Sequence, residues 1–296
     1  MDHLRPSAEI ITRRVDLQFD PSRGSGWIPD EPATELLTNT LSLMFPAGEG
    51  FFIESVQHYQ GQIVDPQLRE DLRRFVYQEA MHMAQHGHCN RALCASHPGA
   101  AQVGRIAGFF LGAARRFGTR KFRLAVTCAL EHFTAMLADH LLGDLEKFGS
   151  NGRAEFVQLW AWHAVEETEH KGVCFDVYES VAGKGVWAYL VRSWAMILTT
   201  LGLGAAIGIG ALHMRPRKSS APAPAAARQA GQRGHGTALQ LLRRIVPWRL
   251  YLSYYSPSFH PWNHDNRHLI EAWKVRYPAF GSAPGASNRP DRAAGT

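Results

Sequence analysis

Residues 160–176 read WAWHAVEETEHKGVCFD, and the organisation of the rest of the chain follows from them. The segment has no proline and a single late glycine, so its composition favours a helix. On a helix that turns about 100° per residue, His163, Glu167 and His170 fall at about 0°, 40° and −20°, within one narrow stripe. Two imidazoles and one carboxylate on such a stripe can bind a first-row transition metal.

Large apolar residues are interleaved with this polar stripe, among them Trp160, Trp162 and Phe175. A glutamate-rich helix face can simply be solvated, and a lone Glu-x-x-His pair is compatible with that alternative. The crowding by tryptophan and phenylalanine argues instead that the segment is buried. Buried charge needs a compensating partner, and a metal ion would supply one.

A second segment repeats the pattern. Residues 75–90 read FVYQEAMHMAQHGHCN and carry Glu79 and His82, again as Glu-x-x-His, with His86 one helical turn later. Two Glu-x-x-His helices are what a carboxylate-bridged di-metal bundle requires, together with one glutamate from each of two further helices.

Two glutamates stand at suitable places for the remaining ligands. Glu54 lies within GFFIESVQHY at residues 50–59, and Glu131 lies within LAVTCALEHF at residues 124–133. Each is almost the only acid in an apolar run. The sequence therefore predicts an all-α fold, in which a four-helix bundle surrounds a di-metal centre and additional apolar helices follow toward the C-terminus.

Four pieces of the sequence resemble a bacterial family catalogued as predicted metal-dependent hydrolases. They are residues 44–52 (MFPAGEGFF), Glu79-x-x-His82-x-x-x-His86, the run from His163 to Lys171, and residues 259–262 (FHPW). More broadly, the chain resembles the ferritin-like di-iron carboxylate proteins, which implies a ferritin-like bundle. Because the hydrolase label of the family is itself a prediction, it does not decide the reaction type.

The position of His163, one turn before Glu167, also resembles the seven-ligand sites of the p-aminobenzoate N-oxygenase type. The predicted metal ligands are accordingly Glu54, Glu79, His82, Glu131, His163, Glu167 and His170. His86, His132 and Glu166 are candidates for orienting these ligands or for joining them. For His163 the alternative is a core histidine bonded to a backbone carbonyl.

Four glutamates and three neutral imidazoles suit two ions of iron, or of manganese, better than zinc, which favours tetrahedral sites. The favoured function is an O2-dependent oxidation of a small hydrophobic substrate, with an external electron donor left open. The first alternative is a hydrolase that uses metal-activated water. The second is a non-catalytic metal-binding protein. The sequence does not determine the substrate, the metal or whether the chain forms a homodimer.

The predicted bundle with its apolar last helix occupies residues 33–214 of the 296. Residues 1–32 precede it as an extension with a predicted short strand at 8–18, and Pro46 is predicted to end one helix before a second runs from about Gly48 to Tyr59. Residues 219–236, rich in Ala, Pro, Gln and Gly, are predicted to be a disordered linker. A helical and loop cover follows at 237–280, with His260 and His264 in its loop, and a tail at 281–296.

Residues 194–214 contain no Lys, Arg, Asp or Glu, which satisfies the length test for a membrane span. A buried or interfacial helix is preferred, because a single span would separate the C-terminal cover from the bundle. The net charge of +6 comes without a nucleic-acid motif, so it predicts solvation or contact with anionic lipid. Four cysteines without paired spacing predict a cytoplasmic protein, with association to a membrane surface left open.

Overall fold

The computed structural model describes residues 7–214 and 247–280, and within these ranges every regular element is a helix. The predicted all-α fold is thereby confirmed. The helices are α1 (Pro32–Gln57), α2 (Pro66–Ser96), α3 (Ala100–Phe117), α4 (Arg120–Gly143), α5 (Leu145–Gly149), α6 (Ala154–His170), α7 (Val173–Ala182), α8 (Val186–Met214), α11 (Trp248–Ser253) and α12 (Arg267–Arg276). The predicted linker at 219–236 and the tail at 281–296 lie outside the described residues.

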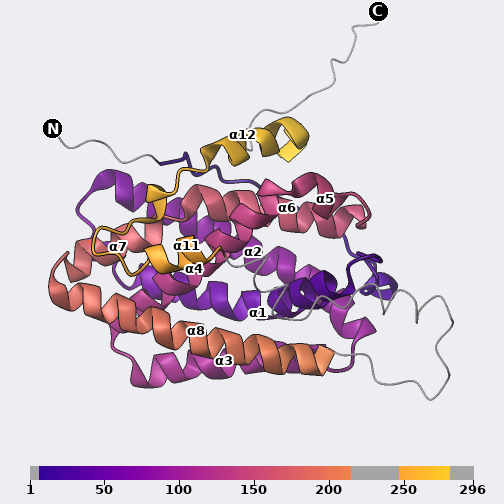
Figure 1. Cartoon of the computed structure of the whole chain (residues 1–296), viewed down its shortest axis with the longest axis horizontal. Coiled ribbons are helices and arrows are strands. Elements are labelled where there is room, and N and C mark those ends of the chain that lie inside the picture. Colours follow the sequence, from indigo (N-terminus) through magenta and orange to yellow (C-terminus); the bar gives the residue numbers. More distant parts are fainter. Residues whose placement is uncertain (1–6, 215–246, 281–296) are drawn as a thin grey trace, which may run out of the picture.

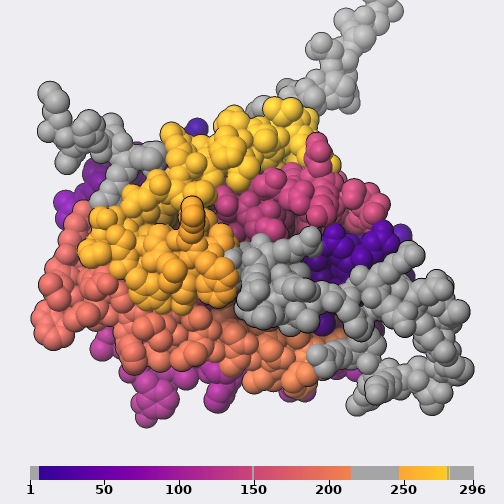
Figure 2. All heavy atoms as spheres, in the orientation of Figure 1, coloured from indigo at the N-terminus to yellow at the C-terminus, as the bar shows by residue number. Residues whose placement is uncertain are grey.

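Long helices lie side by side around a shared core (Figure 1). Helix α1 packs on α2 and α3, α4 packs on α6 and α8, and α3 and α8 run along one edge of the molecule. The C-terminal segment packs α12 on α6 and α4, and α11 on α4. Figure 2 shows this orange-to-yellow segment spread over the face formed by α6 and the neighbouring helices, as a cover.

Helix α1 runs without a break through Pro46, so the predicted interruption at this proline is wrong. Pro46 has no N–H, and it leaves the carbonyl of Ser42, four residues earlier, without its usual helical donor. Asn90 of α2 supplies the missing bond, because its Nδ2 donates to Ser42 O at 2.8 Å. Packing against α2 therefore offsets the local cost of the proline.

The segment at residues 160–176 is not one helix, because α6 ends at His170 and α7 begins at Val173. Gly172 lies at the break, against the ring of Trp262 from the C-terminal cover. A Cβ atom at this glycine would come within 2.8 Å of Trp262 Cδ1. The glycine therefore allows the cover to approach the backbone at the end of α6.

No strand forms at residues 8–18, which was predicted as a short strand. The segment lies extended along α2 and α6, and it buries Ile10, Val15 and Leu17. Its Arg13 side chain is also buried, at 2% exposure. An isolated strand has no partner for its backbone, and here side chains of the helices take that role. Gln78 Nε2 donates to Ile11 O, and Gln85 Nε2 donates to Val15 O.

Candidate metal centre

Three helices direct predicted acidic and imidazole ligands to one place in the core. Glu79 and His82 come from α2, Glu131 from α4, and His163, Glu167 and His170 from α6. These six predicted ligands are all buried, with exposures from 0 to 4%. The Glu-x-x-His spacing places two ligands of each pair one helical turn apart, on the same inward face.

The cluster divides into two groups that could each hold a metal ion. Glu49, His82 and His163 form one, and Glu79, Glu167 and His170 form the other. Within each group the ligand atoms lie within 4.8 Å of one another. Glu131 belongs beside the second group, because its Oε2 lies 3.5 Å from His170 Nε2.

Glu167 stands between the two groups. Its Oε1 lies 3.1 Å from His163 Nε2 and 3.6 Å from His82 Nδ1, while its Oε2 lies 3.6 Å from His170 Nε2. One carboxylate thus presents one oxygen to each group, which is the geometry of a bridging ligand. Glu79 Oε1 also reaches both groups, at 3.3 Å from His170 Nε2 and 3.9 Å from His82 Nδ1.

The structure does not bring Glu54 to this cluster. Its side chain is 42% exposed and pairs with Arg115 at 2.7 Å, with Arg120 and Arg123 at 3.6 Å. Glu49, five residues earlier on the same helix, is 2% exposed and lies in the cluster instead. Five residues correspond to a rotation of about 140°, so the two glutamates of a continuous helix point to different sides. The prediction of Glu54 is corrected to Glu49.

The polar atoms of this cluster are buried without hydrogen-bond partners. They are both oxygens of Glu49, Glu79 and Glu131, Oε2 of Glu167, Nδ1 of His82, and Nε2 of His163 and His170. Native proteins leave only a few such atoms per hundred residues unsatisfied, whereas ten of them gather in this one cluster. A concentration of carboxylate and imidazole atoms that face each other fits a metal centre, since each can donate a lone pair to a cation.

The pKa shifts of the buried carboxylates also favour a cation in this cluster. Burial, followed by the charge of neighbouring glutamates, raises the pKa of Glu49, Glu79 and Glu131 well above the usual range. Burial also opposes ionisation of Glu167, but His170 and His163 beside it hold its pKa well below the usual range. Four carboxylates this close need cations before all of them can ionise.

His82 is oriented by a carboxylate behind it. Its Nε2 lies 3.1 Å from Glu166 Oε2, so Nε2–H donates there and Nδ1 keeps a lone pair toward the cluster. Glu166 is held in turn by Arg13, at 3.1 Å. Glu166 thus contacts His82 from the side away from the cluster. This position suits the orienting role, which was one of the two roles predicted for Glu166.

His170 is oriented by an amide. Its Nδ1 lies 2.9 Å from Gln78 Oε1. Gln78 cannot be turned around, because its Nε2 donates to Ile11 O at 3.1 Å and to Glu169 Oε2 at 3.0 Å. His170 therefore carries a proton on Nδ1, which leaves Nε2 as the ring nitrogen that can bind a cation in the cluster.

His163 is oriented through a longer relay of hydrogen bonds. Asn90 Nδ2 donates to Ser42 O, so Asn90 Oδ1 must accept, and Ser42 Oγ donates to it at 2.8 Å. Ser42 Oγ then accepts from His86 Nδ1 at 2.8 Å. His86 Nε2 accepts in turn from His163 Nδ1 at 2.9 Å. This leaves Nε2 of His163, which faces Glu167, as the ring nitrogen that can bind a cation, and His86 orients the ring from behind.

His132 lies away from the two groups, although it follows Glu131 directly. Its Nε2 donates to Leu250 O at 3.0 Å, and its ring contacts Tyr254 and Phe259 of the C-terminal cover. Burial lowers the pKa of His132 to about 4. It therefore holds the cover as a neutral donor and does not orient a ligand.

Several residues of the site were missed by the sequence analysis. Glu49 stands in MFPAGEGFF, one of the motifs on which the family resemblance rests, so this motif could have identified Glu49 as a candidate ligand. Arg13, Gln78 and Glu169 form a buried network in which Arg13 Nη2 lies 2.6 Å from Glu169 Oε1. Arg13 lies more than 150 residues from its partners, and sequence spacing carries no sign of such a contact.

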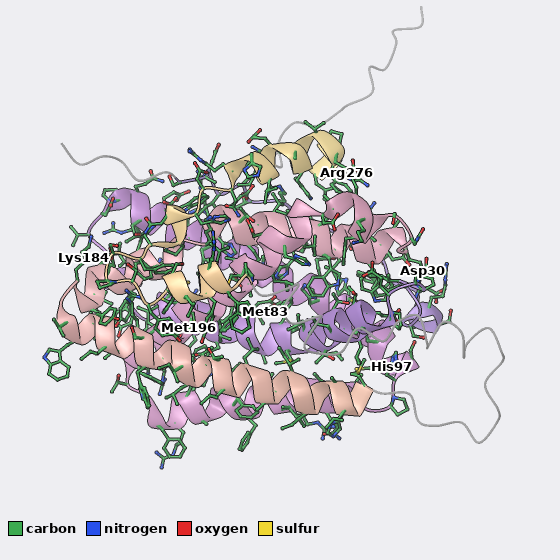
Figure 3. The ribbon with its side chains drawn as sticks, in the orientation of Figure 1. Asp30, Met83, His97, Lys184, Met196 and Arg276 are labelled. Atoms are coloured by element: carbon green, nitrogen blue, oxygen red, sulfur yellow. The ribbon has the colours of Figure 1, made fainter. Side chains whose placement is uncertain are left out.

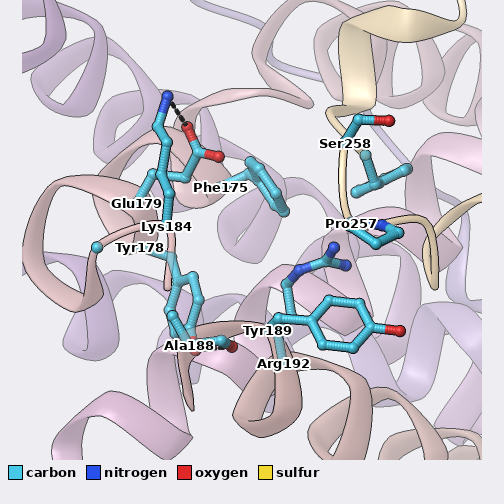
Figure 4. A pocket seen from close by; sticks show the side chains of 11 residues that line it. Phe175, Tyr178, Glu179, Lys184, Ala188, Tyr189, Arg192, Pro257 and Ser258 are labelled. Carbon is cyan, nitrogen blue, oxygen red and sulfur yellow. Dashed lines mark hydrogen bonds and ion pairs between the residues drawn. The ribbon is translucent and has the colours of Figure 1, made fainter. Parts of the chain in front are cut away.

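A pocket of about 200 Å³ opens between α7, the start of α8 and the loop at 257–259 (Figure 4). Its walls combine the aromatic rings of Phe175, Tyr178 and Tyr189 with the charged side chains of Lys184 and Arg192. Lys184 Nζ lies 3.1 Å from Glu179 Oε2. Phe175 and Phe259, which contact each other, belong to the apolar cluster that also includes Ala129, two residues before Glu131.

Residues 11–265 match the model of a family described as predicted metal-dependent hydrolase. The match covers most of the chain and every residue of the two groups. No curated protein and no solved structure matches the chain. The ferritin-like relationship therefore stays a prediction.

Proposed function

The chain belongs to the predicted metal-dependent hydrolase family, and we propose that it hydrolyses a small, largely hydrophobic substrate at a centre of two metal ions. The single observation that carries the proposal is the set of buried, unpartnered ligand atoms on Glu49, Glu79, Glu131 and the three histidines. The family description and the two candidate metal groups support the hydrolytic reaction more directly than oxidation.

In this proposal Glu49, His82 and His163 would hold one ion, Glu79, Glu131 and His170 would hold the other, and Glu167 could serve both groups. The four carboxylates would balance the charge of two divalent cations, which makes burial of the complete centre favourable. Two such cations polarise a substrate oxygen and lower the pKa of water at the site.

The residues behind the ligands prepare the site before any substrate arrives. Glu166, Gln78 and His86 each hold one imidazole so that its free lone pair faces the cluster. Arg13 pairs with Glu166 and Glu169, so it holds the residues behind His82 and His170 in place. Such support fixes ring orientation and protonation, and its loss typically weakens metal binding by about 10- to 100-fold.

The substrate is proposed to reach the centre from the pocket beside the C-terminal cover. Phe175 and Phe259 line that pocket and share an apolar cluster with Ala129, two residues before Glu131, and these aromatic walls favour an apolar substrate. The C-terminal cover, which His132 and Lys171 contact, would have to open for access.

Oxidation is kept as a second candidate because the donor set is unusually rich in carboxylates. Four glutamates and three imidazoles within a helical core are typical of di-iron and di-manganese sites. On this alternative the ions are iron, or manganese, and an external electron donor is required.

The test combines metal analysis with a comparison of reaction conditions. The purified full-length protein should contain about two transition-metal ions per chain, and metal-free protein should regain them on addition of iron or manganese. A panel of apolar esters and phosphoesters should then be hydrolysed equally well with and without O2, and only by the metal-loaded protein.

Each alternative has its own outcome. Turnover of an apolar substrate only with both O2 and a reductant would replace hydrolysis by oxidation. Full metal loading without turnover in either condition would favour a non-catalytic role. A protein without stoichiometric metal after such reconstitution would remove the metal centre itself.

A further inference from the structure

Large apolar side chains are exposed along one face of the molecule, on α8 and on the neighbouring helix α3. On α8 they recur at three- and four-residue steps, so they form one stripe: Trp187 (81% exposed), Leu190, Trp194 (58%), Ile197, Leu198, Leu201 (65%), Ile209 and Leu212. On α3, Phe109 and Phe117 are exposed to 72 and 82%. Exposed apolar faces of this extent usually contact a partner or a membrane.

The two helices lie against each other, so their exposed residues make one surface. A Cβ at Gly202 would contact Phe110, and Gly210 lies against Val103, which sets α3 antiparallel to α8. Figure 3 shows side chains that project outward from both helices, on the side away from the bundle. At about 1.5 Å per residue, α8 alone extends this surface over about 40 Å.

The opposite side of α8 is packed against the protein. Ala195 and Met196 are fully buried, and Arg192, the only Lys, Arg, Asp or Glu in the helix, points inward. Its guanidinium donates to the carbonyls of Tyr254 and Ser256 in the C-terminal cover. Among the described residues, α8 is the one helix long and apolar enough to cross a membrane, but its attachment to α3, α4 and α1 prevents lipid from surrounding it.

The charged residues of α3 and α8 themselves have one sign. Neither α3 nor α8 contains Asp or Glu. Arg105 and Arg116 of α3 are exposed, and helical spacing places both on the same side as Phe109, about one and two turns away from it. Aromatic side chains beside basic ones match the interface of an anionic bilayer, where rings lie at headgroup depth. In a symmetric dimer through this surface, neither helix could supply an acid to pair with those arginines.

We propose that the α3–α8 surface, defined by the apolar residues above with Arg105 and Arg116, docks the protein on an anionic lipid bilayer, with α8 parallel to the membrane plane. The apolar stripe enters the boundary between headgroups and acyl chains, and the arginines contact lipid phosphates. This inference concerns where the protein lies and does not depend on the reaction at the metal centre.

The test is co-sedimentation of the metal-loaded, full-length protein with vesicles of phosphatidylcholine, with and without phosphatidylglycerol. The wild-type protein should bind the anionic vesicles and be released by alkaline carbonate. Leu201→Glu and Trp194→Glu should each weaken binding by about ten-fold or more. Val275→Glu, which places the same charge at a still more exposed apolar position of α12, should bind as the wild-type protein does.

The charge contribution is tested separately. Arg105→Gln and Arg116→Gln should each reduce binding to anionic vesicles by roughly five-fold and leave weak binding to neutral vesicles unchanged. Metal content and helical content should be the same in all variants, which keeps this test independent of the proposed function.

Three results would overturn the proposal. Wild-type protein that stays in the supernatant, or equal losses in Val275→Glu and Leu201→Glu, would show that the stripe does not contact lipid. A change from dimer to monomer in Leu201→Glu without an effect on vesicle binding would assign the surface to a second copy of the chain. Resistance to carbonate extraction would show that α8 spans the membrane.

Discussion

Glu49 and Glu54 show how much depends on a single position of one helix. Both stand in the apolar second half of α1, yet one faces the metal centre and the other faces three arginines at the surface. An arginine cluster gives an exposed carboxylate partners that cost little desolvation. A carboxylate in the core has no such partners, and there a cation is needed.

We predict that Glu49→Gln lowers the metal content from about two ions per chain to about one or less. The amide has the shape of the carboxylate but lacks its charge, so the ion held with His82 and His163 loses a ligand. Elemental analysis after reconstitution measures the effect. Glu54→Gln is the matched control, and it should keep both ions. If the Glu49→Gln protein kept both ions, Glu49 would not be a metal ligand.

Ser42 is a residue whose importance comes only from the relay that it completes. We predict that Ser42→Ala weakens binding of the ion at His163 by about 10- to 100-fold, because His86 then lacks the acceptor that fixes its protonated nitrogen. Competition with a chromophoric chelator gives the affinity, and nitrogen chemical shifts of the imidazoles report the tautomer of His163.

Ser55→Ala provides the comparison for this effect. Ser55 is a buried serine of the same helix, and its hydroxyl donates only to Phe51 O of its own backbone. The Ser55→Ala protein should bind metal as the wild-type protein does. Equal losses of affinity in both variants would point to a general loosening of α1 and not to the relay.

At the scale of elements, the end of α6 joins the metal centre to the C-terminal cover. His170 faces the cluster, and Lys171 beside it turns outward to donate to His264 O at 2.6 Å and Asn266 Oδ1 at 2.7 Å. Its ammonium also lies 4.1 Å from the centroid of the Trp262 ring. A displacement of the cover can therefore move His170 through Lys171, the next residue in the chain.

The Lys171 contacts predict a pH dependence of stability. Burial lowers the pKa of Lys171 from 10.5 to about 8, although Asp139 and Asp265 oppose the shift. Between these values the unfolded chain holds a proton that the folded protein has lost, so the free energy of unfolding rises with pH across this window. The contribution is lost as the pH falls through about 8, and it amounts to about 3 kcal/mol at most.

The measurement is chemical unfolding of the wild-type protein and of Lys171→Met across that pH window. Because methionine does not titrate, the difference between their free energies of unfolding should grow in favour of the wild-type protein as the pH rises. A difference that stays constant would mean that Lys171 keeps an ordinary pKa in the folded protein.

At the scale of the whole molecule, the metal centre links four helices that are distant in the chain. We predict that removal of metal by a chelator lowers the free energy of unfolding by about 3 kcal/mol, if free metal otherwise exceeds its dissociation constant by about a hundred-fold. For a chain of this size, that loss corresponds to a fall in Tm of several degrees, at roughly 2–4 °C per kcal/mol. Calorimetry with and without chelator measures it.

The same experiment should depend on pH in a defined direction. The pKa values of Glu49, Glu79 and Glu131 are raised in the metal-free fold, so their protonated forms contribute stability that is fully present below about 4.5 and is lost as the pH rises. Chelation should therefore destabilise the protein more at pH 8 than at pH 6. A Tm that does not respond to chelator would contradict a structural role of the metal.

The sequence by itself determined which helices form and which residue types they direct inward. The spacing of Glu79 with His82, and of Glu167 with His170, is a local property of a helix, since one turn separates the members of each pair. Family membership also followed from local motifs, and the match to residues 11–265 confirms it.

Only the tertiary structure decided which glutamate of α1 enters the centre and what holds the histidines. Whether Pro46 ends a helix depends on a donor from α2, and the continuity of α1 sets the rotation between Glu49 and Glu54. The pairs of Arg13 with Glu166 and Glu169 join residues far apart in the chain. Such contacts depend on how separate elements pack, and helical periodicity describes each element alone.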